Sequence, residues 1–454
     1  MGSSGLSGTW VGADNVALFT DLYELTMAQA YVANGLATRE ATFSLFARTL
    51  PAQRNYLLAC GLDSVLGYLE SLQFSDDNIA YLRTLKRFSP EFLDWLREFR
   101  FTGDVVAVPE GTPVFAGVPM LEITAPLAEA QIVETFVMNQ MHVQTVQASK
   151  AARVVAAAAG RTVVDFGARR MHGTDAAIKA ARACAIAGVS GTSNVLAAQM
   201  YGLTPVGTMA HSYVQAYGSE LEALRTFARQ YPGTTLLVDT YDTLRGVRHA
   251  VEIAQELGPG AVTAVRLDSG DLAVLSRGAR AILDEAGLPR VEIFASGGLD
   301  EYAIADLMAK EAPINGFGVG TRMGVSEDAP SFDIVYKMTE CAGQGRLKRS
   351  TGKEVLPGRK QVFRDEHRGI SAGDTITRAA ERLLGRALLQ PVMSEGKRLP
   401  AGRVSLDAAR AYAKAEIAKL PRPVRGLVPA QPPYPVMISP ELAAYAKSVA
   451  AELR

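Results

Sequence analysis

The sequence predicts an α/β barrel flanked by a separate β-rich domain. Between residues 161 and 321, short β-branched runs that end in polar or glycine residues alternate with helical patterns rich in Ala and Leu. Continuous apolar strands between amphipathic helices are typical of a parallel sheet covered by helices. On either side, at 104–124 and 334–364, shorter β-like runs are interrupted by turn signals, which indicates hairpins in another layer.

The repeating region supplies seven strand-like runs with helical patterns between them. The runs are 161–167, 187–193, 204–210, 234–240, 261–270, 291–298 and 314–321. The helical patterns are 176–187, 194–202, 219–232, 244–258, 271–287 and 300–311. Because right-handed crossovers keep all helices outside, the pattern indicates a closed or nearly closed barrel. An open doubly wound sheet is the alternative.

The flanking segments predict a second domain that is discontinuous in sequence. We expect the β-like runs at 104–124 and 334–364 to pair with each other across the barrel insertion. A Pro-rich tail then leads to a last helix at 440–453. The predicted segments are 1–145 (helical start and β-rich domain), 146–335 (barrel) and 336–454 (completion of the β-rich domain, tail and terminal helix).

The amino-acid composition limits the kinds of partner and the cellular compartment that we expect. The 454 residues carry 47 Lys and Arg against 47 Asp and Glu, so no overall charge favours nucleic acid or anionic membranes. No run reaches the roughly 18 apolar residues that span a bilayer. Cys60, Cys184 and Cys341 are widely spaced, which fits a reducing, cytoplasmic setting rather than a disulfide framework or a zinc site.

The glycine-rich ends of the last two strands predict a phosphate site. Active sites of α/β barrels form where the carboxyl ends of strands meet, and glycine allows a phosphate to approach the backbone. The candidates are Ser296, Gly297, Gly298, Gly318, Gly320 and Thr321. Tight strand-to-helix turns are the structural alternative. A dinucleotide fingerprint is disfavoured, because GFGVG lacks the required spacing and the acid that follows it.

Acidic, basic and aromatic residues follow other strands of the predicted barrel. In RLDSGDL, Asp268 and Asp271 stand beside Arg266, a group suited to ribose hydroxyls and to Mg²⁺ carrying a pyrophosphate. Helix capping by Asp268, with Asp271 in the first turn, is the alternative. In DFGARR, Phe166 and Arg169 suit a flat anionic ring and a phosphate. A core Phe with surface arginines is the structural alternative, and it is favoured when such a triplet is taken in isolation.

His211 lies in GTMAHS, just past another strand-like run. A neutral imidazole there could act as a base or as a phosphoryl acceptor. A hydrogen-bonded histidine at a helix start is the structural alternative, and the position at the barrel mouth favours the functional one.

Together these motifs resemble those of nicotinate phosphoribosyltransferases. The matching runs are TDLYELTMAQAY (20–31), DFGARRMHG (165–173), GTSNVLA (191–197), GTMAHS (207–212), RLDSGDL (266–272), SGGLDEY (296–302), GFGVGT (316–321), KQVFR (360–364) and YPVMISPEL (434–442). They occur in order and cover nearly the whole chain. The resemblance implies a type II phosphoribosyltransferase: an irregular, TIM-like α/β barrel with a discontinuous β-rich second domain.

The resemblance also implies roles for individual residues in a homodimer with a shared site. Tyr23 would reach into the neighbouring subunit and stack on the pyridine ring, with Phe166 on the other face. Its helix-face pattern alone favours a buried core tyrosine instead. Thr208 and Arg266 would contact nicotinate, and Arg169 and the glycine clusters would hold phosphates.

The implied reaction transfers 5-phosphoribosyl from 5-phosphoribosyl 1-diphosphate (PRPP) to nicotinate, giving nicotinate mononucleotide and pyrophosphate for NAD biosynthesis. Family members couple it to ATP hydrolysis through a phosphohistidine, which corresponds to His211. Asp268 and Asp271 would steady the ribose and Mg²⁺. The alternatives are nicotinamide as acceptor and a non-catalytic barrel that binds a phosphate ligand. The basic segment 345–364 is expected to be a solvated hairpin rather than a surface for an acidic partner.

Overall fold

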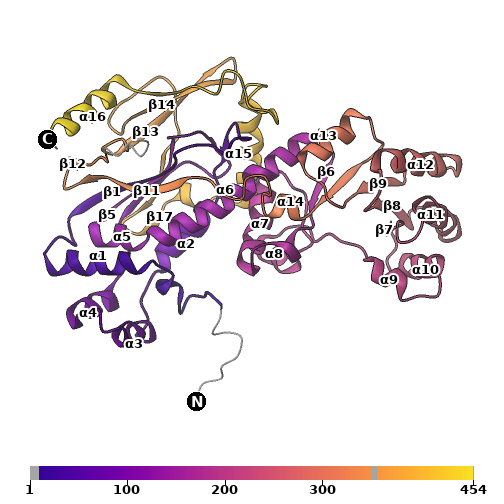
Figure 1. Cartoon of the computed structure of the whole chain (residues 1–454), viewed down its shortest axis with the longest axis horizontal. Coiled ribbons are helices and arrows are strands. Elements are labelled where there is room, and N and C mark those ends of the chain that lie inside the picture. The colour runs from indigo at the N-terminus through magenta and orange to yellow at the C-terminus, as the bar shows by residue number, and fades with distance from the viewer. Residues whose placement is uncertain (1–9, 349–354, 453–454) are drawn as a thin grey trace. The chain divides into compact units, whose positions relative to one another are not determined.

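The chain forms two compact units (Figure 1). The structure is a computed structural model that describes residues 10–348 and 355–452. One unit comprises 1–145 with 331–454, and the other comprises 146–330; we call them the β-rich unit and the barrel unit. The second boundary falls before strand β11, which begins at Ile334, so residues 331–335 belong to the β-rich unit.

A parallel sheet forms the centre of the barrel unit. Its strands run in the order β6-β10-β9-β8-β7. They are β6 (Thr162–Asp165), β7 (Thr234–Leu237), β8 (Val262–Leu267), β9 (Glu292–Ala295) and β10 (Gly316–Val319). Single parallel bridges continue from Asp165 to Thr192 and from Thr192 to Pro205. All seven predicted runs therefore enter the sheet, five as strands and two as isolated bridges.

The pairing order identifies this sheet as an irregular barrel. The last strand, β10, pairs with the first, β6, and the remaining neighbours follow the order of the sequence. A doubly wound sheet would instead reverse direction at a switch point. Among the described residues no ladder joins Pro205 to β7, so the barrel is open at that position.

The six predicted helices of this unit are confirmed. They are α7 (Thr174–Ile186), α8 (Val195–Tyr201), α10 (Glu220–Gln230), α11 (Thr243–Leu257), α12 (Leu272–Glu285) and α13 (Glu301–Ala309). The side chains of Asp242, Asp271 and Asp300 cap α11, α12 and α13, which satisfies amide groups that the helices leave unpaired. The sequence did not predict α6 (Glu134–Ala157), α9 (His211–Gln215), α14 (Thr321–Gly324) or the 3-10 turn η3 (Ala168–Arg170).

The β-rich unit is built from both ends of the chain. Its larger sheet has the order β12-β11-β1-β5-β3-β16-β17, and a smaller one has the order β15-β13-β14-β18. The strands are β1 (Glu40–Ala47), β2 (Leu57–Leu58), β3 (Asp104–Ala107), β4 (Pro113–Val114), β5 (Pro119–Pro126), β11 (Ile334–Cys341), β12 (Gln344–Gly345), β13 (Lys360–His367), β14 (Ile370–Arg378), β15 (Arg386–Ala387), β16 (Gln390–Ser394), β17 (Lys397–Arg398) and β18 (Val436–Ile438).

The expected direct pairing of 104–124 with 334–364 is wrong, because no ladder joins the described residues of the two segments. Strand β1 lies between β5 and β11 and pairs antiparallel with both. The 104–124 segment thus shares a sheet with β11 and β12 through an intermediate strand that the sequence analysis did not identify, whereas β13, the last part of 334–364, belongs to the smaller sheet. Seven of the eight β1 residues are buried, because this strand forms the middle of the sheet.

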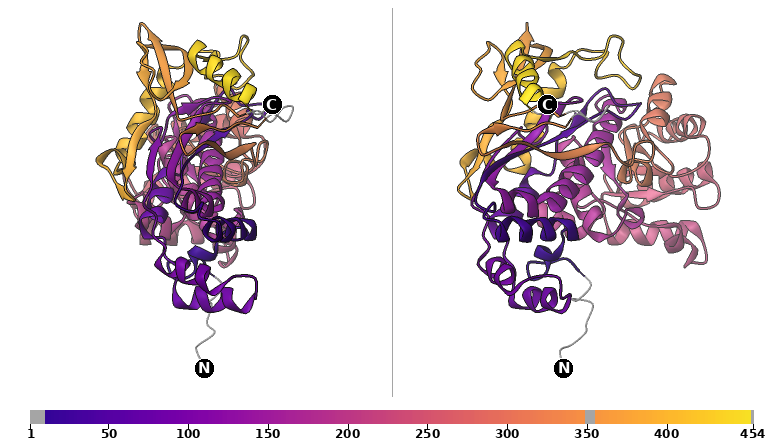
Figure 2. Two further views of the ribbon diagram at one scale, coloured as in Figure 1. Left: turned by 90° about the vertical axis from the view of Figure 1, so that its left-hand side faces the viewer. Right: turned by 60° about the vertical axis from the view of Figure 1, so that its left-hand side comes forward.

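Helices flank these sheets. They are η2 (Val16–Leu18), α1 (Leu22–Ala33), α2 (Leu62–Ser71), α3 (Asp76–Thr84), α4 (Pro90–Glu98), α5 (Leu127–Ile132), η4 (Pro400–Gly402), α15 (Leu406–Lys419) and α16 (Pro440–Glu452). The expected terminal helix is confirmed as α16, which packs beside β14 (Figure 2). No helix among residues 10–348 and 355–452 is both long and apolar enough to cross a membrane. Cys60, Cys184 and Cys341 are buried, and no disulfide joins them.

The basic segment 345–364 is only partly described, since 349–354 lie outside the described residues. Its last part enters β13, which pairs with β14 and β15. Lys360 forms a buried ion pair with Glu122 at 3.0 Å, and Arg359 pairs with acids of β1 and β11. These cations are therefore neutralised within the unit.

The guanidinium of Arg364 organises the interior of the smaller sheet. It is fully buried and donates to both carboxylate oxygens of Asp374, at 2.8 and 2.7 Å. It also lies over the rings of Phe115 and Tyr434, 5.6 and 5.8 Å from their centroids, and these rings stack at 3.8 Å. The KQVFR and YPVMISPEL motifs thus meet in one packed cluster.

Replacing Asp374 by Ala should destabilise the protein by about 3–5 kcal/mol, because the buried Arg364 charge loses its bidentate partner and its remaining ion-pair partner, Glu416, lies 3.7 Å away. Chemical denaturation measures the loss. Glu441→Gln is the matched control, since Glu441 forms an exposed pair with Arg378 at 3.6 Å and should leave stability unchanged. Equal midpoints for the two variants would contradict the role given to the buried pair.

Candidate active site

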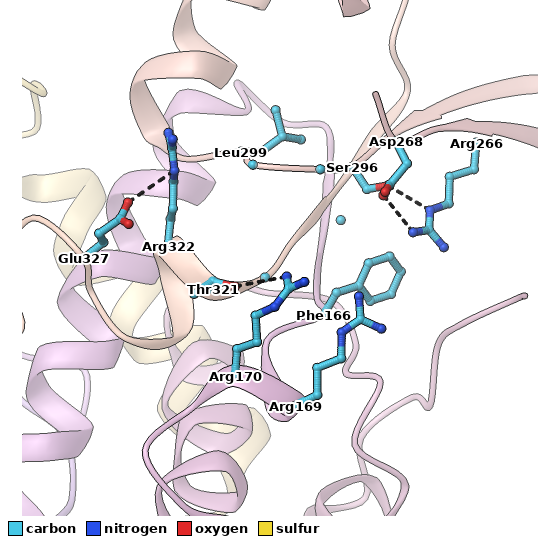
Figure 3. Close-up of a pocket in the computed structure, with 14 residues that line it drawn as sticks. Phe166, Arg169, Arg170, Arg266, Asp268, Ser296, Leu299, Thr321, Arg322 and Glu327 are labelled. Carbon is cyan, nitrogen blue, oxygen red and sulfur yellow. Dashed lines mark hydrogen bonds and ion pairs between the residues drawn. The ribbon is translucent and has the colours of Figure 1, made fainter. Parts of the chain in front are cut away.

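A cavity of about 240 Å³ opens at the carboxyl ends of the strands in the barrel unit (Figure 3). Residues from four strand ends and from the turns after them line it. They are Phe166, Arg169, Arg170, Arg266, Asp268, Ser296, Gly297, Gly298, Leu299, Gly318, Gly320, Thr321, Arg322 and Glu327. The structure thus gathers Phe166, both glycine clusters and the Arg266–Asp268 pair around one hollow, as the strand-end argument predicted.

The Asp268 carboxylate connects the polar groups of this cavity. Its Oδ1 accepts from Arg266 Nη2 at 2.8 Å and from the hydroxyl of Ser296. The same hydroxyl also accepts from Arg266 Nε at 2.8 Å. Figure 3 shows this triangle on one side of the cavity. Because these residues end neighbouring strands β8 and β9, the parallel sheet itself brings them together.

The hydrogen bonds also fix the charge of this group. Partial burial raises the pKa of Asp268, but the donors Ser296 and Arg266 outweigh that effect and lower its pKa below the usual range. The carboxylate therefore stays ionised at neutral pH. An ionised Asp268 keeps Arg266 paired and leaves Arg266 Nη1 without a partner among the described residues.

His211 faces this carboxylate. Its Nε2 lies 4.0 Å from Asp268 Oδ2, and its Nδ1 lies 3.1 Å from Thr240 Oγ1. His211 is the first residue of α9 and its side chain is 41% exposed, so it remains accessible. His211 and Arg266 open toward the same side of the barrel unit, since both reach Asp268.

The turn after β7 supports the same group. Asp239 Oδ2 accepts from the Asp268 amide at 2.9 Å and from the Ser269 hydroxyl at 2.6 Å. Its Oδ1 is buried and has no hydrogen-bond partner in the described part of the chain. A buried carboxylate oxygen in this condition requires a donor or a cation.

Phe166 forms the apolar wall of the cavity. The preceding residue, Asp165, is buried and accepts from the Gly167 amide and the Thr192 hydroxyl, both at 2.8 Å, which fixes the turn. Burial raises the Asp165 pKa despite these donors. The Arg266 guanidinium lies 5.2 Å from the centroid of the Phe166 ring, a cation–π arrangement.

Glycine is required on steric grounds at two positions around the cavity. A Cβ on Gly318 would overlap the Phe166 ring, and a Cβ on Gly297 would overlap the backbone carbonyl of Asp268. Gly297 and Gly298 also have φ of +87° and +62°, which disfavours other residues. Gly297 therefore lets the turn after β9 approach the turn after β8 closely, and Gly318 lets Phe166, which follows β6, lie against β10.

Cations surround the open side of the cavity. Arg169 makes no ion pair or side-chain hydrogen bond with another described residue. Arg170 donates weakly to the Thr321 hydroxyl at 3.4 Å, whereas Arg322 pairs with Asp300 at 2.7 Å and with Glu327 at 3.2 Å (Figure 3). Unpaired guanidinium groups beside glycine amides can bind phosphate oxygens.

Three sequence candidates lie elsewhere. Asp271 itself caps α12 through the amides of Ala273 and Val274. The helix-cap alternative is therefore right about the kind of contact but wrong in giving the cap to Asp268 and the first turn to Asp271. Thr208 does not line the cavity, although its hydroxyl is buried and unpaired within the described ranges. Tyr23 belongs to the β-rich unit, where it is 47% exposed. A buried core tyrosine is therefore not what the structure shows.

Several site residues were missed. Thr240 contacts His211, and Leu299, Arg322 and Glu327 line the cavity. Arg322 follows Thr321, which was already recognised at a strand end, so extending that motif by one position would have found it. Thr240 ends the strand-like run 234–240, but no local pattern marks its contact with His211. Glu327 follows the short helix α14, and no local pattern marks it.

A second cavity, of about 410 Å³, is the other candidate for the active site. It lies at the amino ends of strands, between Gly160 and Thr162 and near Asn315. Its two arginines are engaged: Arg280 binds Asp284 and two carbonyl groups, and Arg161 binds the Ile314 carbonyl. No histidine or carboxylate lines it, so it lacks the acid and base groups of the first cavity.

Comparisons with known proteins agree with this geometry. The profile of the nicotinate phosphoribosyltransferase N-terminal domain matches residues 18–142, and that of the nicotinate phosphoribosyltransferase family matches 162–368. A nicotinate phosphoribosyltransferase of Mycobacterium tuberculosis is 55% identical over 93% of this chain and 91% of its own length. One of Bacillus subtilis is 39% identical over 80% of this chain and 76% of its own.

Solved structures show the same fold. The human nicotinic acid phosphoribosyltransferase superposes with a TM-score of 0.84 and 27% identity, covering 94% of this chain and 99% of its own. The nicotinate-nucleotide pyrophosphorylase of Pyrococcus furiosus follows with a TM-score of 0.74 and 26% identity, covering 90% and 97%. By these matches over both units, the chain belongs to the nicotinate phosphoribosyltransferase family.

Proposed function

We propose that this chain transfers the 5-phosphoribosyl group of PRPP to nicotinate and that ATP hydrolysis, through phosphorylation of His211, drives the transfer. The observation that carries the proposal is that His211 faces Asp268, which together with Arg266 lines a cavity rimmed by arginines and glycines. Membership of the family supplies the reaction class, and the cavity supplies groups for a phosphorylated donor and an anionic acceptor.

In the proposed transfer, the ring nitrogen of nicotinate attacks C1 of the ribose. A C–N bond forms, the bond from C1 to the pyrophosphate oxygen breaks, and the electron pair leaves with pyrophosphate. Phe166 offers a ring face for the pyridine, and Arg266 Nη1 can donate to its carboxylate. Arg169 and the backbone amides around Gly298 and Gly320 stabilise the negative charge that develops on the leaving pyrophosphate.

The ionised Asp268 suits the other developing charge. As C1 loses its bond to pyrophosphate, positive charge appears on the ribose, and a nearby carboxylate stabilises it. The lowered pKa of Asp268 keeps this carboxylate charged at neutral pH. Its stabilising interaction should fade only as the pH falls below the ordinary range for aspartate.

In the coupling step, a neutral imidazole nitrogen of His211 attacks the terminal phosphorus of ATP. A P–N bond forms, the bond to the bridging oxygen breaks, and ADP leaves. Water later attacks the phosphorus, which releases inorganic phosphate and restores the imidazole. The triphosphate of ATP and the pyrophosphate of PRPP present the same chemistry, so one arginine-rimmed cavity can serve both in turn.

The residues present fit a Mg²⁺ ion that binds together with the phosphates of the substrate, and not one held by protein ligands alone. No cluster of three potential metal ligands occurs among the described residues, and Asp271 is committed to its helix. The unpaired Oδ1 of Asp239 and the free oxygen of Asp268 could hold an ion that keeps waters and binds phosphates. When bound, Mg²⁺ would neutralise charge on the pyrophosphate.

We further propose a homodimer in which Tyr23 completes the site of the partner. Tyr23 and its neighbour Leu22 are 47% and 45% exposed at the start of α1. Exposed aromatic and aliphatic side chains of this kind are enriched in contact surfaces. This arrangement would give nicotinate a second aromatic face opposite Phe166.

Product analysis tests the reaction. We expect nicotinate mononucleotide from PRPP and nicotinate, with formation stimulated by ATP, and little product from nicotinamide. His211→Ala should abolish the stimulation, because no other described residue places an imidazole beside Asp268. Mass spectrometry identifies the nucleotide. A nicotinamide nucleotide as main product, binding without turnover, or undiminished stimulation in His211→Ala would each refute the corresponding part of the proposal.

The glycine of β10 beside Phe166 provides a steric test. Gly318→Ala should raise the KM for nicotinate about tenfold, roughly 1.4 kcal/mol, because its Cβ displaces the Phe166 ring. Gly316→Ala is the matched control. Gly316 lies on the same strand as Gly318, but its Cβ would overlap Phe294 of β9, which does not line the cavity. Steady-state kinetics compares them, and equal KM values would remove Phe166 from the acceptor site.

Subunit complementation tests the shared site. Tyr23→Ala and His211→Ala chains should each be deficient, but mixing them should restore about a quarter of wild-type activity. Half of randomly assembled dimers are mixed, and each mixed dimer has one intact site if the tyrosine acts in trans. Activity is measured after co-expression with two affinity tags. Mixed dimers without recovered activity would show that Tyr23 does not act in the neighbouring subunit.

A further inference from the structure

The imidazole of His211 is held along one edge by Thr240. Thr240 Oγ1 lies 3.1 Å from His211 Nδ1, and Nε2 faces Asp268 Oδ2 at 4.0 Å. The distance to Asp268 is too long for a hydrogen bond. The contact with Thr240 is therefore the one hydrogen bond that the His211 ring makes to the described residues.

This side chain needs external support. It stands at the first position of α9, a helix of five residues whose N-terminal flank makes no side-chain cap. The ring is 41% exposed, so packing alone does not fix it. The final torsion of histidine is broad and roughly two-fold. Without a partner on Nδ1, the ring could rotate and turn Nε2 away from Asp268.

The end of β7 supports both members of the pair. Asp239 binds the backbone amide of Asp268, and the next residue, Thr240, binds the ring of His211. A single strand end thus fixes the carboxylate and the imidazole relative to each other. Histidines in metal and catalytic sites are commonly oriented in this way by a partner on the second ring nitrogen.

We propose that Thr240 is a positioning residue for His211: its hydroxyl sets the rotation of the imidazole and thereby the rate at which His211 takes the phosphoryl group. This inference rests on the proposed coupling of ATP to His211. The Thr240 hydroxyl contacts the imidazole itself, so it acts through the ring and not on the substrates.

Thr240→Val removes the hydroxyl and keeps the branched shape. We expect formation of the acid-labile phosphoenzyme from ATP labelled at its terminal phosphate to slow by about tenfold to a hundredfold. The ratio of transferase rates with and without ATP should fall with it. Thr240→Ser keeps the hydroxyl and should stay close to wild type, because the contact with Nδ1 is restored.

Thr263→Val is the matched control. The Thr263 hydroxyl donates to the Gly233 carbonyl at 2.8 Å, at the amino end of the neighbouring strand β8, so its loss should leave phosphoenzyme formation unchanged. If Thr240→Val fails to fold, comparison of Thr240→Ala with Thr240→Ser asks the same question, since these two differ by the hydroxyl alone.

The outcomes separate this inference from the proposed function. If His211→Ala abolishes the phosphoenzyme and Thr240→Val forms it at the wild-type rate, Thr240 has no positioning role. If His211→Ala still forms the phosphoenzyme, the proposed coupling itself fails. Slow formation in Thr240→Val with rescue in Thr240→Ser supports the inference, whereas equal slowing in both variants would reduce Thr240 to a packing role and overturn it.

Discussion

The interaction on which the site depends is the charge-assisted hydrogen bonding of Asp268 with Arg266 and Ser296. Each member alone would be costly at a half-buried strand end, because an unpaired charge or hydroxyl loses its water there. Together they satisfy one another, keep Asp268 ionised and leave one edge of the guanidinium available. The direction of the strands makes this possible, since parallel strands deliver their carboxyl ends to one edge.

The site also requires that the strand ends approach one another closely. This requirement explains why several glycines line the cavity. Gly297 brings the turn after β9 against the Asp268 carbonyl, and Gly318 allows the Phe166 ring to lie against β10. With side chains at these points the strand ends could not come together. The same glycines carry no side chain over their amides, so the steric requirement and the proposed phosphate binding fall on the same residues.

The barrel and most of its site could be predicted because their signals are local. Each strand, the turn after it and the cap of the next helix lie within about ten residues of one another. Strand β8, the turn at Asp268 and the helix cap at Asp271 are an example. The β-rich unit could not be predicted in the same way, because its order depends on pairings between distant segments such as β1 with β11. Thr240 escaped prediction for a related reason: its role appears only when β7 lies beside the loop that carries His211.

A motif of the family resemblance does not by itself indicate a catalytic role, and a comparison of the two units shows why. Arg266 and Arg364 both lie in motifs of the family resemblance, and both bind an aspartate and lie over an aromatic ring. Arg266 is partly exposed and lines a cavity, whereas Arg364 is wholly buried, its pKa raised by Asp374 despite the opposing effect of burial. A group without access to solvent cannot meet a substrate. The same local pattern therefore builds a binding site at one strand end and a structural core at another, and only the packing around it decides which.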